Sequence, residues 1–148
     1  MKKLLTIFML CFGLLLTGCA TTAMDTVEND LQAKKFDVPM EGNSGIYIYR
    51  NSFIGKALKK NLYIDDKLLG QSAPDVYFYK QVKAGSHKIS TESEFSNNNL
   101  SLSTESGKNY FIRQYIKVGV FVGGASLEQV PEEQGKIDIL KLKRAKDL

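Results

Sequence analysis

Cys19 lies in the sequence setting that most clearly indicates chemistry, because a thiol is a strong nucleophile. A basic start, Met1-Lys2-Lys3, is followed by a largely apolar run over residues 4–16, and Cys19 comes three residues later. The run of about a dozen apolar residues is shorter than the roughly 20 that a membrane-spanning helix needs. Length and basic start favour a removable signal peptide, and a retained transmembrane segment is the alternative.

The residues Leu16-Thr17-Gly18-Cys19 resemble the lipobox of bacterial lipoproteins. In that motif the cysteine thiol receives a diacylglycerol group, and the signal peptidase then cuts just before the cysteine. The resemblance implies removal of residues 1–18 and a diacylglycerol and N-acyl anchor on Cys19, which multiple acyl chains make effectively permanent. Ala20, not Asp, follows Cys19; by the sorting rule of enteric-type bacteria this favours the inner leaflet of the outer membrane, facing the periplasm.

The alternative for Cys19 is an ordinary thiol that happens to follow a secretory signal. The second cysteine, Cys11, lies in the apolar run and would be removed with it, so the mature chain could form no internal disulfide. A free thiol is unusual in an exported protein, whereas a lipidated cysteine is expected there. Cysteine usage therefore favours the lipoprotein interpretation.

Composition excludes several classes of protein. The 148 residues are 43% hydrophobic and carry 20 basic and 16 acidic side chains, a net charge of +4. These values argue against wholesale disorder and against a multi-pass membrane protein. Loss of residues 1–18 removes two lysines and brings the mature chain closer to neutrality, so no nucleic-acid partner is expected.

His87 is the only histidine, so a Ser-His-Asp hydrolase would have to use it as the base. The closest candidate nucleophile, Ser86, is too near in sequence, and no serine lies in a Gly-x-Ser-x-Gly elbow. A metal site needs several converging ligands, which one histidine does not supply. We expect no catalytic residue, no metal and no cofactor besides the lipid on Cys19. A small periplasmic hydrolase that uses His87 is the alternative.

Tyrosines and arginines in predicted strands suggest a binding surface. Its candidate members are Tyr47, Tyr49, Arg50, Arg113 and Tyr115, together with Phe121 in the glycine-rich segment 119–124. Such a surface could stack on sugars or bind peptide carboxylates. The ordinary alternatives are that the tyrosines are half-buried strand residues and that the glycines mark a bulge or turn.

Apolar residues alternate with tyrosines from residue 45 onward, and this period of two is typical of half-buried strands. Strands are predicted around residues 46–49, 62–64, 76–82, 87–93, 100–104, 110–118 and 126–130. Turns are predicted at residues 65–67 and 83–86, and a turn spacing of roughly 8–12 residues is typical of a sandwich or small barrel. The pattern therefore predicts a mainly β protein with an antiparallel β-sandwich.

Pro131, followed by two glutamates, predicts a short C-terminal helix, because proline and acidic residues suit the first turn. Ile137, Leu140 and Ile139 are expected to dock this helix, although Gly135 weakens it. Ahead of the sandwich, residues 19–44 are predicted to form the lipidated N-terminus and a flexible tether, with a helical turn or packing segment near residues 31–36. The sandwich with its helix is assigned to residues 45–148.

Two segments, residues 63–70 and 82–89, resemble the strand–Asp-turn–strand and Ala-Gly-x-His-x-hydrophobic pattern of PEGA-type β-domains. With residues 45–50, 110–113 and 127–130, the chain resembles an uncharacterised bacterial lipoprotein family, domain of unknown function 2846, over about residues 33–143. The resemblance implies a sandwich of the PEGA, immunoglobulin or prealbumin kind and brings no catalytic residues. Asp66 departs from the pattern, because related turns usually have glycine there.

These observations predict a membrane-anchored envelope lipoprotein that acts as a non-catalytic binding module. Its partner is expected to be an envelope protein or peptidoglycan. The contact is predicted to involve an exposed strand edge, the tyrosine surface or the segment 119–124.

Overall fold

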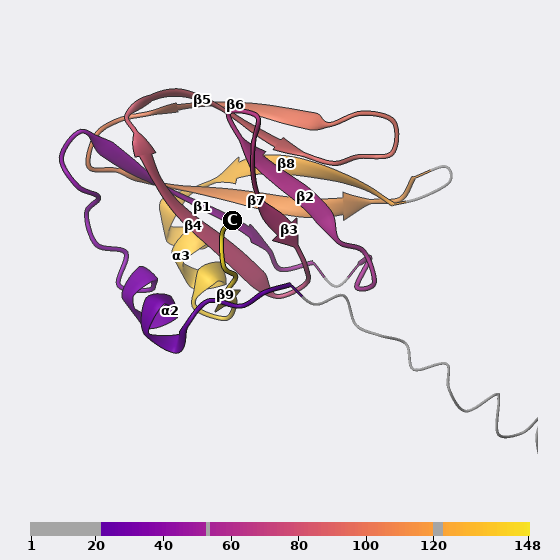
Figure 1. The fold of residues 1–148 in the computed structure, drawn as a ribbon, viewed down its shortest axis with the longest axis horizontal. Coiled ribbons are helices and arrows are strands. Elements are labelled where there is room, and N and C mark those ends of the chain that lie inside the picture. The colour runs from indigo at the N-terminus through magenta and orange to yellow at the C-terminus, as the bar shows by residue number, and fades with distance from the viewer. Residues whose placement is uncertain (1–21, 53, 120–122) are drawn as a thin grey trace, which may run out of the picture.

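Two β-sheets face each other across an apolar core, and two short helices cover the outer face of one sheet (Figure 1). The computed structural model describes residues 22–52, 54–119 and 123–148. The five-stranded sheet has the order β8 (Gly124–Val130), β7 (Asn109–Lys117), β1 (Asn43–Arg50), β4 (Val76–Lys83) and β9 (Lys143–Arg144). The four-stranded sheet has the order β3 (Lys67–Ser72), β2 (Lys60–Ile64), β5 (Gly85–Thr91) and β6 (Asn98–Thr104). The helices are α2 (Val27–Ala33) and α3 (Glu132–Ile139).

The predicted fold class, a mainly β sandwich with a short C-terminal helix, is confirmed. The strand pairs are antiparallel with two exceptions: β7 runs parallel to β1, and β9 runs parallel to β4. The first exception arises because the chain builds the whole four-stranded sheet before β7 returns beside β1. The five-stranded sheet is therefore mixed.

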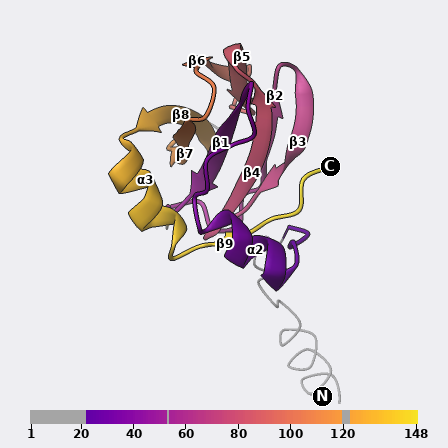
Figure 2. The ribbon, with the colours of Figure 1, turned by 90° about the vertical axis from the view of Figure 1, so that its left-hand side faces the viewer.

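Strand β1 is buried on both faces, not half-buried as its alternating pattern suggests. Ile46 and Ile48 point into the core between the two sheets. Tyr47 and Tyr49 point the other way, into a second apolar cluster beneath the helices. Figure 2 shows the reason: α2 and α3 lie on one side of β1 and β4, and β2 and β3 lie on the other.

The predicted hairpin between β2 and β3 is confirmed and turns at Asp65 and Asp66. Both residues have left-handed backbone angles, with φ of 50° and 63°. Two consecutive positive φ values are the signature of a type I′ turn, whose twist matches that of the flanking strands. Aspartate tolerates this region better than most side chains, so Asp66 keeps the turn where related domains have glycine.

Helix α3 begins after Pro131, as predicted, but docks differently from the prediction. Ile139 is buried, whereas Ile137 and Leu140 are exposed, so the sequence assigned the docking face incorrectly. Gly135 explains the difference because it lies directly against a ring: a Cβ atom added there would be 2.3 Å from Cγ of Phe111. The helix approaches β7 through this glycine.

Residues 22–42, predicted to be part of a tether, pack against the sandwich in the structure. The N–H of Asp25 donates to the carbonyl of Arg144 at 3.0 Å, and that of Lys146 donates to the carbonyl of Ala23 at 2.9 Å. Helix α2 begins directly after Thr26, whose hydroxyl caps it by accepting from the N–H of Asn29. Residues ahead of β1 therefore belong to the folded part of the chain, from at least Ala23 onward.

Candidate functional site

The predicted tyrosine surface is largely an interior layer of the protein. Tyr47 and Tyr49 are 1% exposed and Arg50 is fully buried, so none of the three can meet a partner in the folded state. The rings of Tyr47 and Phe111 stack, with centroids 4.9 Å apart. We call this group the aromatic layer; its members are Phe36, Tyr47, Tyr49, Tyr77, Tyr79 and Phe111.

Hydroxyl groups of the aromatic layer hold the two helices on the sheet. Tyr47 donates to the carbonyl of Ala33 at the end of α2, at 2.8 Å. Tyr49 donates to Oδ2 of Asp138 in α3 at 2.6 Å, and Tyr77 donates to Oδ1 of Asp30 in α2 at 2.8 Å. Burial raises the pKa of all three tyrosines well above the usual value, which keeps the hydroxyls protonated as donors. Their role here is structural.

Arg50 uses its guanidinium to order the loop that follows β1. It donates to the carbonyl of Leu58 at 2.6 Å and to that of Gly55 at 2.5 Å. Burial lowers the pKa of Arg50, and the nearby carboxylate of Asp75 opposes that change. The side chain predicted to bind a ligand therefore binds the protein's own main chain.

Arg113 and Tyr115 are half-buried on β7, and Arg113 lies beside Tyr49 as its register partner on β1. The guanidinium of Arg113 forms an ion pair with Glu128 of β8 at 2.5 Å, and this bond raises the pKa of Arg113. The ammonium of Lys117 lies 5.6 Å from the centre of the Tyr115 ring. Phe121 lies outside the described residues.

His87 connects two turns of the fold, the one between β2 and β3 and the one between β4 and β5. Its Nδ1 is 2.7 Å from Oδ2 of Asp65, and its Nε2 is 2.7 Å from the carbonyl of Lys83. Burial acts to lower the pKa of His87, but these two bonds outweigh it and the pKa is raised. A carbonyl accepts but cannot donate, so Nε2 carries a hydrogen and offers no lone pair to a nucleophile.

Two further features of the described residues bear on function. No group of three or more His, Cys, Asp or Glu side chains in residues 22–52, 54–119 and 123–148 is placed to hold a metal ion. In the same ranges, no helix is both long enough and apolar enough to cross a membrane.

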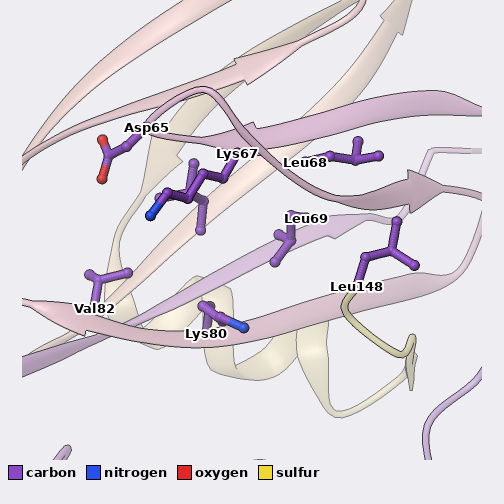
Figure 3. A pocket seen from close by; sticks show the side chains of 8 residues that line it. Asp65, Lys67, Leu68, Leu69, Lys80, Val82 and Leu148 are labelled. Carbon is purple, nitrogen blue, oxygen red and sulfur yellow. The ribbon is translucent and has the colours of Figure 1, made fainter.

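A hollow of about 280 Å³ lies at one side of the sandwich, where β3 and β4 approach each other. We call it the edge groove. It is lined by the apolar side chains Ile64, Leu68, Leu69, Val82 and Leu148 and by the charged side chains Asp65, Lys67 and Lys80. Figure 3 shows Leu69 and Val82 on opposite walls of the groove, with Leu148 at one end.

Main-chain edges of two strands border the edge groove. Strand β3 pairs with β2 on one side, and its other side faces the groove. Strand β4 pairs with β1 along its whole length, but on its outer side β9 covers only Val76 and Tyr77. Within the described residues, the outer edge of β4 from residue 78 to 83 therefore has no strand partner. Unpaired edges are sites where another strand can add.

The chain's own last residues already use this edge. The N–H of Leu148 donates to the carbonyl of Leu69 at 3.0 Å, and the ammonium of Lys80 forms an ion pair with Asp147. Leu69 lies where the register between β2 and β3 shifts, so a bulge turns this carbonyl outward. The edge of β3 thus accepts a main-chain donor in the folded protein.

The sequence predicts a contact through an exposed strand edge but does not indicate which strand provides that edge. The alternating pattern of β3 and β4 gives no sign of which strands end a sheet, because that depends on sheet order. One sequence feature does point to an edge. Strand β4 begins with apolar and aromatic residues but ends with Lys80 and Lys83, and lysines are common on edge strands.

Comparison with known proteins places the chain in a family. Residues 40–125 match the family described as protein of unknown function (DUF2846), and the chain belongs to this family. It is 70% identical over 133 residues to an uncharacterized protein of Haemophilus influenzae, covering 90% of this chain and 79% of that protein. No solved structure matches the chain. The family assignment confirms the resemblance noted in the sequence, and neither match indicates an enzymatic family.

Proposed function

We propose that this member of the DUF2846 family is a lipid-anchored envelope protein that binds an extended segment of another envelope protein in the edge groove. The observation that carries the proposal is the pair of strand edges, on β3 and β4, that border one apolar hollow. An extended peptide can add to such an edge through main-chain hydrogen bonds, while side-chain pockets select its sequence. The bond from Leu148 to Leu69 is a one-residue example of that contact.

A protein partner fits the groove better than a cell-wall polymer does. Sugar binding would use exposed aromatic faces, and the tyrosines of the aromatic layer are occupied beneath the helices. The groove instead offers aliphatic walls, contributed by Leu69 and Val82, and main-chain donors and acceptors. These features suit an extended peptide that places an apolar side chain against Leu148.

The anchor in this proposal is the lipidated Cys19, and the location is the inner leaflet of the outer membrane, facing the periplasm. Both rest on the basic start, the apolar run and the lipobox-like residues 16–19, followed by Ala20. Replacement of Cys19 by alanine should abolish labelling by a clickable fatty acid in growing cells. Labelling that persists in Cys19→Ala would exclude the anchor.

Catalysis by His87 is the competing function, and the geometry does not favour it. Both ring nitrogens are engaged, one by a carboxylate and one by a carbonyl. We expect His87→Ala to leave partner binding intact and to change no hydrolysis of envelope substrates in cell extracts. A loss of hydrolysis on this substitution would restore the hydrolase and overturn the non-catalytic proposal.

In-cell photocrosslinking tests the binding proposal directly. Leu68 is 41% exposed beside the groove, so a benzoylphenylalanine placed there should crosslink to a discrete protein. Phe95, which is 79% exposed in the connection between β5 and β6, is the matched control position. We expect a specific crosslinked band from residue 68 and none from residue 95.

A variant of the groove gives the test its second arm. Leu148 is largely exposed, so Leu148→Glu should fold normally while placing a charge where an apolar side chain would bind. The band from residue 68 should then be lost, with protein abundance unchanged. Equal bands from residues 68 and 95, or a band that Leu148→Glu does not weaken, would exclude the groove as the binding site.

A further inference from the structure

The hydrogen bonds of Ala23 and Asp25 with residues 144–146 fix which side of the protein lies closest to Cys19. Thr22 lies between two hollows, of about 360 Å³ and 380 Å³, and lines both of them. The elements at this end are α2 and β9, seen at the lower end of Figure 2. Only Ala20 and Thr21 separate Thr22 from Cys19.

The spacing leaves no room for a long tether. A fully extended chain spans at most about 3.6 Å per residue, so the Cα atoms of Cys19 and Thr22 can be about 11 Å apart at most. The polar headgroup region on each side of a bilayer is about 5–8 Å thick. Because Thr22 lies against the folded domain, acyl chains on Cys19 would bring this part of the domain to the headgroups or close to them.

We infer that the face around Thr22 docks on anionic phospholipid headgroups of the membrane that holds Cys19. The inference rests on the proposed lipid anchor. We call this surface the anchor face and define it by Met24, Lys59, Lys141, Lys143, Lys146 and Leu148, all of which line one of the two hollows.

Charge on the anchor face suits an anionic surface. Its four lysines are exposed, and within the described ranges no carboxylate forms an ion pair with any of them. The acidic side chain that lines these hollows is Asp75. Lysines within a Debye length of about 8–10 Å feel the negative potential of anionic lipids. The short link keeps them within that range.

Apolar side chains on the same face can enter the headgroup layer. Met24 is 43% exposed and Leu148 is 81% exposed, and each lies beside lysines of the anchor face. Lysine and exposed apolar residues together are the usual composition of a surface that lies on a membrane. Leu68 and Leu148 also line the edge groove, so the groove opens close to the membrane and its partner must be present there.

The opposite end of the sandwich provides the reference position. Strand β4 runs from Val76, which lines a hollow of the anchor face, to Lys83. At about 3.3 Å per residue these two residues are about 23 Å apart. Ser86, exposed just beyond Lys83, is therefore expected to stay clear of the headgroups.

Headgroup quenching of a fluorescent label tests the inference on the full lipidated protein. Met24→Cys, Lys141→Cys and Ser86→Cys would each be labelled with an environment-sensitive dye, because the cysteine left in the mature chain is the acylated one. The proteins are reconstituted into vesicles of phosphatidylethanolamine and phosphatidylglycerol that carry a nitroxide on the headgroup. We expect loss of fluorescence at residues 24 and 141 and none at residue 86.

Charge reversal distinguishes docking of the anchor face on the headgroups from attachment through the acyl chains alone. Lys141→Glu combined with Lys143→Glu should reduce the quenching at residue 24, as should vesicles of phosphatidylcholine alone. Lys83→Glu combined with Lys108→Glu makes the same change in net charge at the far end and should leave the quenching unchanged. Because two label positions lie on the anchor face, one variant that fails to fold does not end the test.

The outcomes distinguish membrane docking of the anchor face from the proposed lipid anchor on Cys19, on which the docking depends. Equal quenching at residues 24, 141 and 86 overturns the docking, as does quenching at residue 24 that Lys141→Glu with Lys143→Glu leaves unchanged. Purified protein without acyl chains, measured by its intact mass, overturns the anchor itself. That result is obtained before any vesicle is made.

Discussion

Strand β4 contributes to both the aromatic layer and the edge groove. Its side chains are bonded within the protein in the first region and line an open hollow in the second. On the helix side, the hydroxyl groups of Tyr47, Tyr49 and Tyr77 are already bonded to α2 and α3. On the groove side, Lys80 and Val82 line an open hollow beside a strand edge. The comparison shows that the side chains richest in binding chemistry hold this fold together, while the open hollow is bordered by a main-chain edge that has no strand partner among the described residues.

The two regions should also differ in what mutation does to them. In the aromatic layer, ring stacking and buried hydrogen bonds make each residue depend on its neighbours. At the groove, exposed side chains such as Leu148 can change with little loss of stability. Four predictions test how strongly individual residues hold the fold, and they follow in order of decreasing effect.

Gly135→Val should produce the largest loss of stability. A Cβ atom at this position would lie 2.3–2.5 Å from three atoms of Phe111, so α3 must move off the sheet. Overpacking of this severity costs about 3 kcal/mol or more. Denaturant unfolding followed by circular dichroism measures the loss, and the exposed Glu133→Ala on the same helix is the control. A stable Gly135→Val would show that α3 does not hold the aromatic layer.

Arg50→Ala and Arg113→Ala compare a buried and a half-exposed arginine from the same predicted surface. Loss of Arg50 leaves the carbonyls of Gly55 and Leu58 without their charged donor and should cost about 2–3 kcal/mol. Arg113 pairs with a half-exposed Glu128, so its loss should cost less than about 1 kcal/mol. Urea titrations measure both values. Similar values for the two would contradict the assignment of Arg50 to the interior.

Tyr49→Phe and Tyr115→Phe compare two tyrosine hydroxyls. The phenylalanine at residue 49 keeps the ring but leaves Oδ2 of Asp138 without its donor in a buried site, which should cost about 1–2 kcal/mol. The hydroxyl of Tyr115 belongs to a half-buried side chain outside the aromatic layer, so Tyr115→Phe should cost close to nothing. Thermal unfolding of both variants checks the difference, and a larger effect at residue 115 would reverse the comparison.

His87→Gln should give the smallest effect, and that effect should depend on pH. The pKa of His87 is raised by its bonds, so its contribution is fully present below the unfolded pKa of about 6.5 and is lost as pH rises through the folded value. Asp65 has a lowered pKa, so its contribution is lost only as pH falls below about 4. Because Asp65 is about half exposed, solvent limits the pair to below about 1 kcal/mol.

The check is urea unfolding of wild type and His87→Gln at several pH values. The stability difference should be largest near pH 5 and should shrink as the solution becomes alkaline. A difference that stays constant from pH 5 to 9 would mean that His87 is not protonated in the folded state. It would then reopen the question of its role as a base.

Much of the fold follows from local sequence patterns. The alternation in residues 46–49 and 76–79 predicts the strands, and Asp65-Asp66 predicts the hairpin, because both signals act over a few residues. The parallel pairing of β7 with β1 could not be predicted this way, since it depends on where a distant strand returns. The docking of α3 through Gly135 was missed because a missing side chain leaves no periodic signal.

The candidate site was predicted less well than the fold. An Ile–Tyr alternation shows that a strand has two different faces, but not whether helices cover the tyrosine face. Tyr47 and Tyr49 therefore looked like a surface, although their hydroxyl groups bond to α2 and α3. The edge groove depends on sheet order and on the return of the last residues, and no short motif encodes either.

The hydrogen bonds that join Ala23 and Asp25 to residues 144–146 also affect the order in which parts of the chain fold. These contacts link positions about 120 residues apart in the sequence, so they form only when nearly the whole chain is available. Long-range contacts of this kind close late, because the entropy of a large loop must first be overcome. The segment that holds Ala23 and Asp25 is thus among the last to be fixed, and the proposed acylation of Cys19, four residues ahead of Ala23, would find the neighbouring chain still extended.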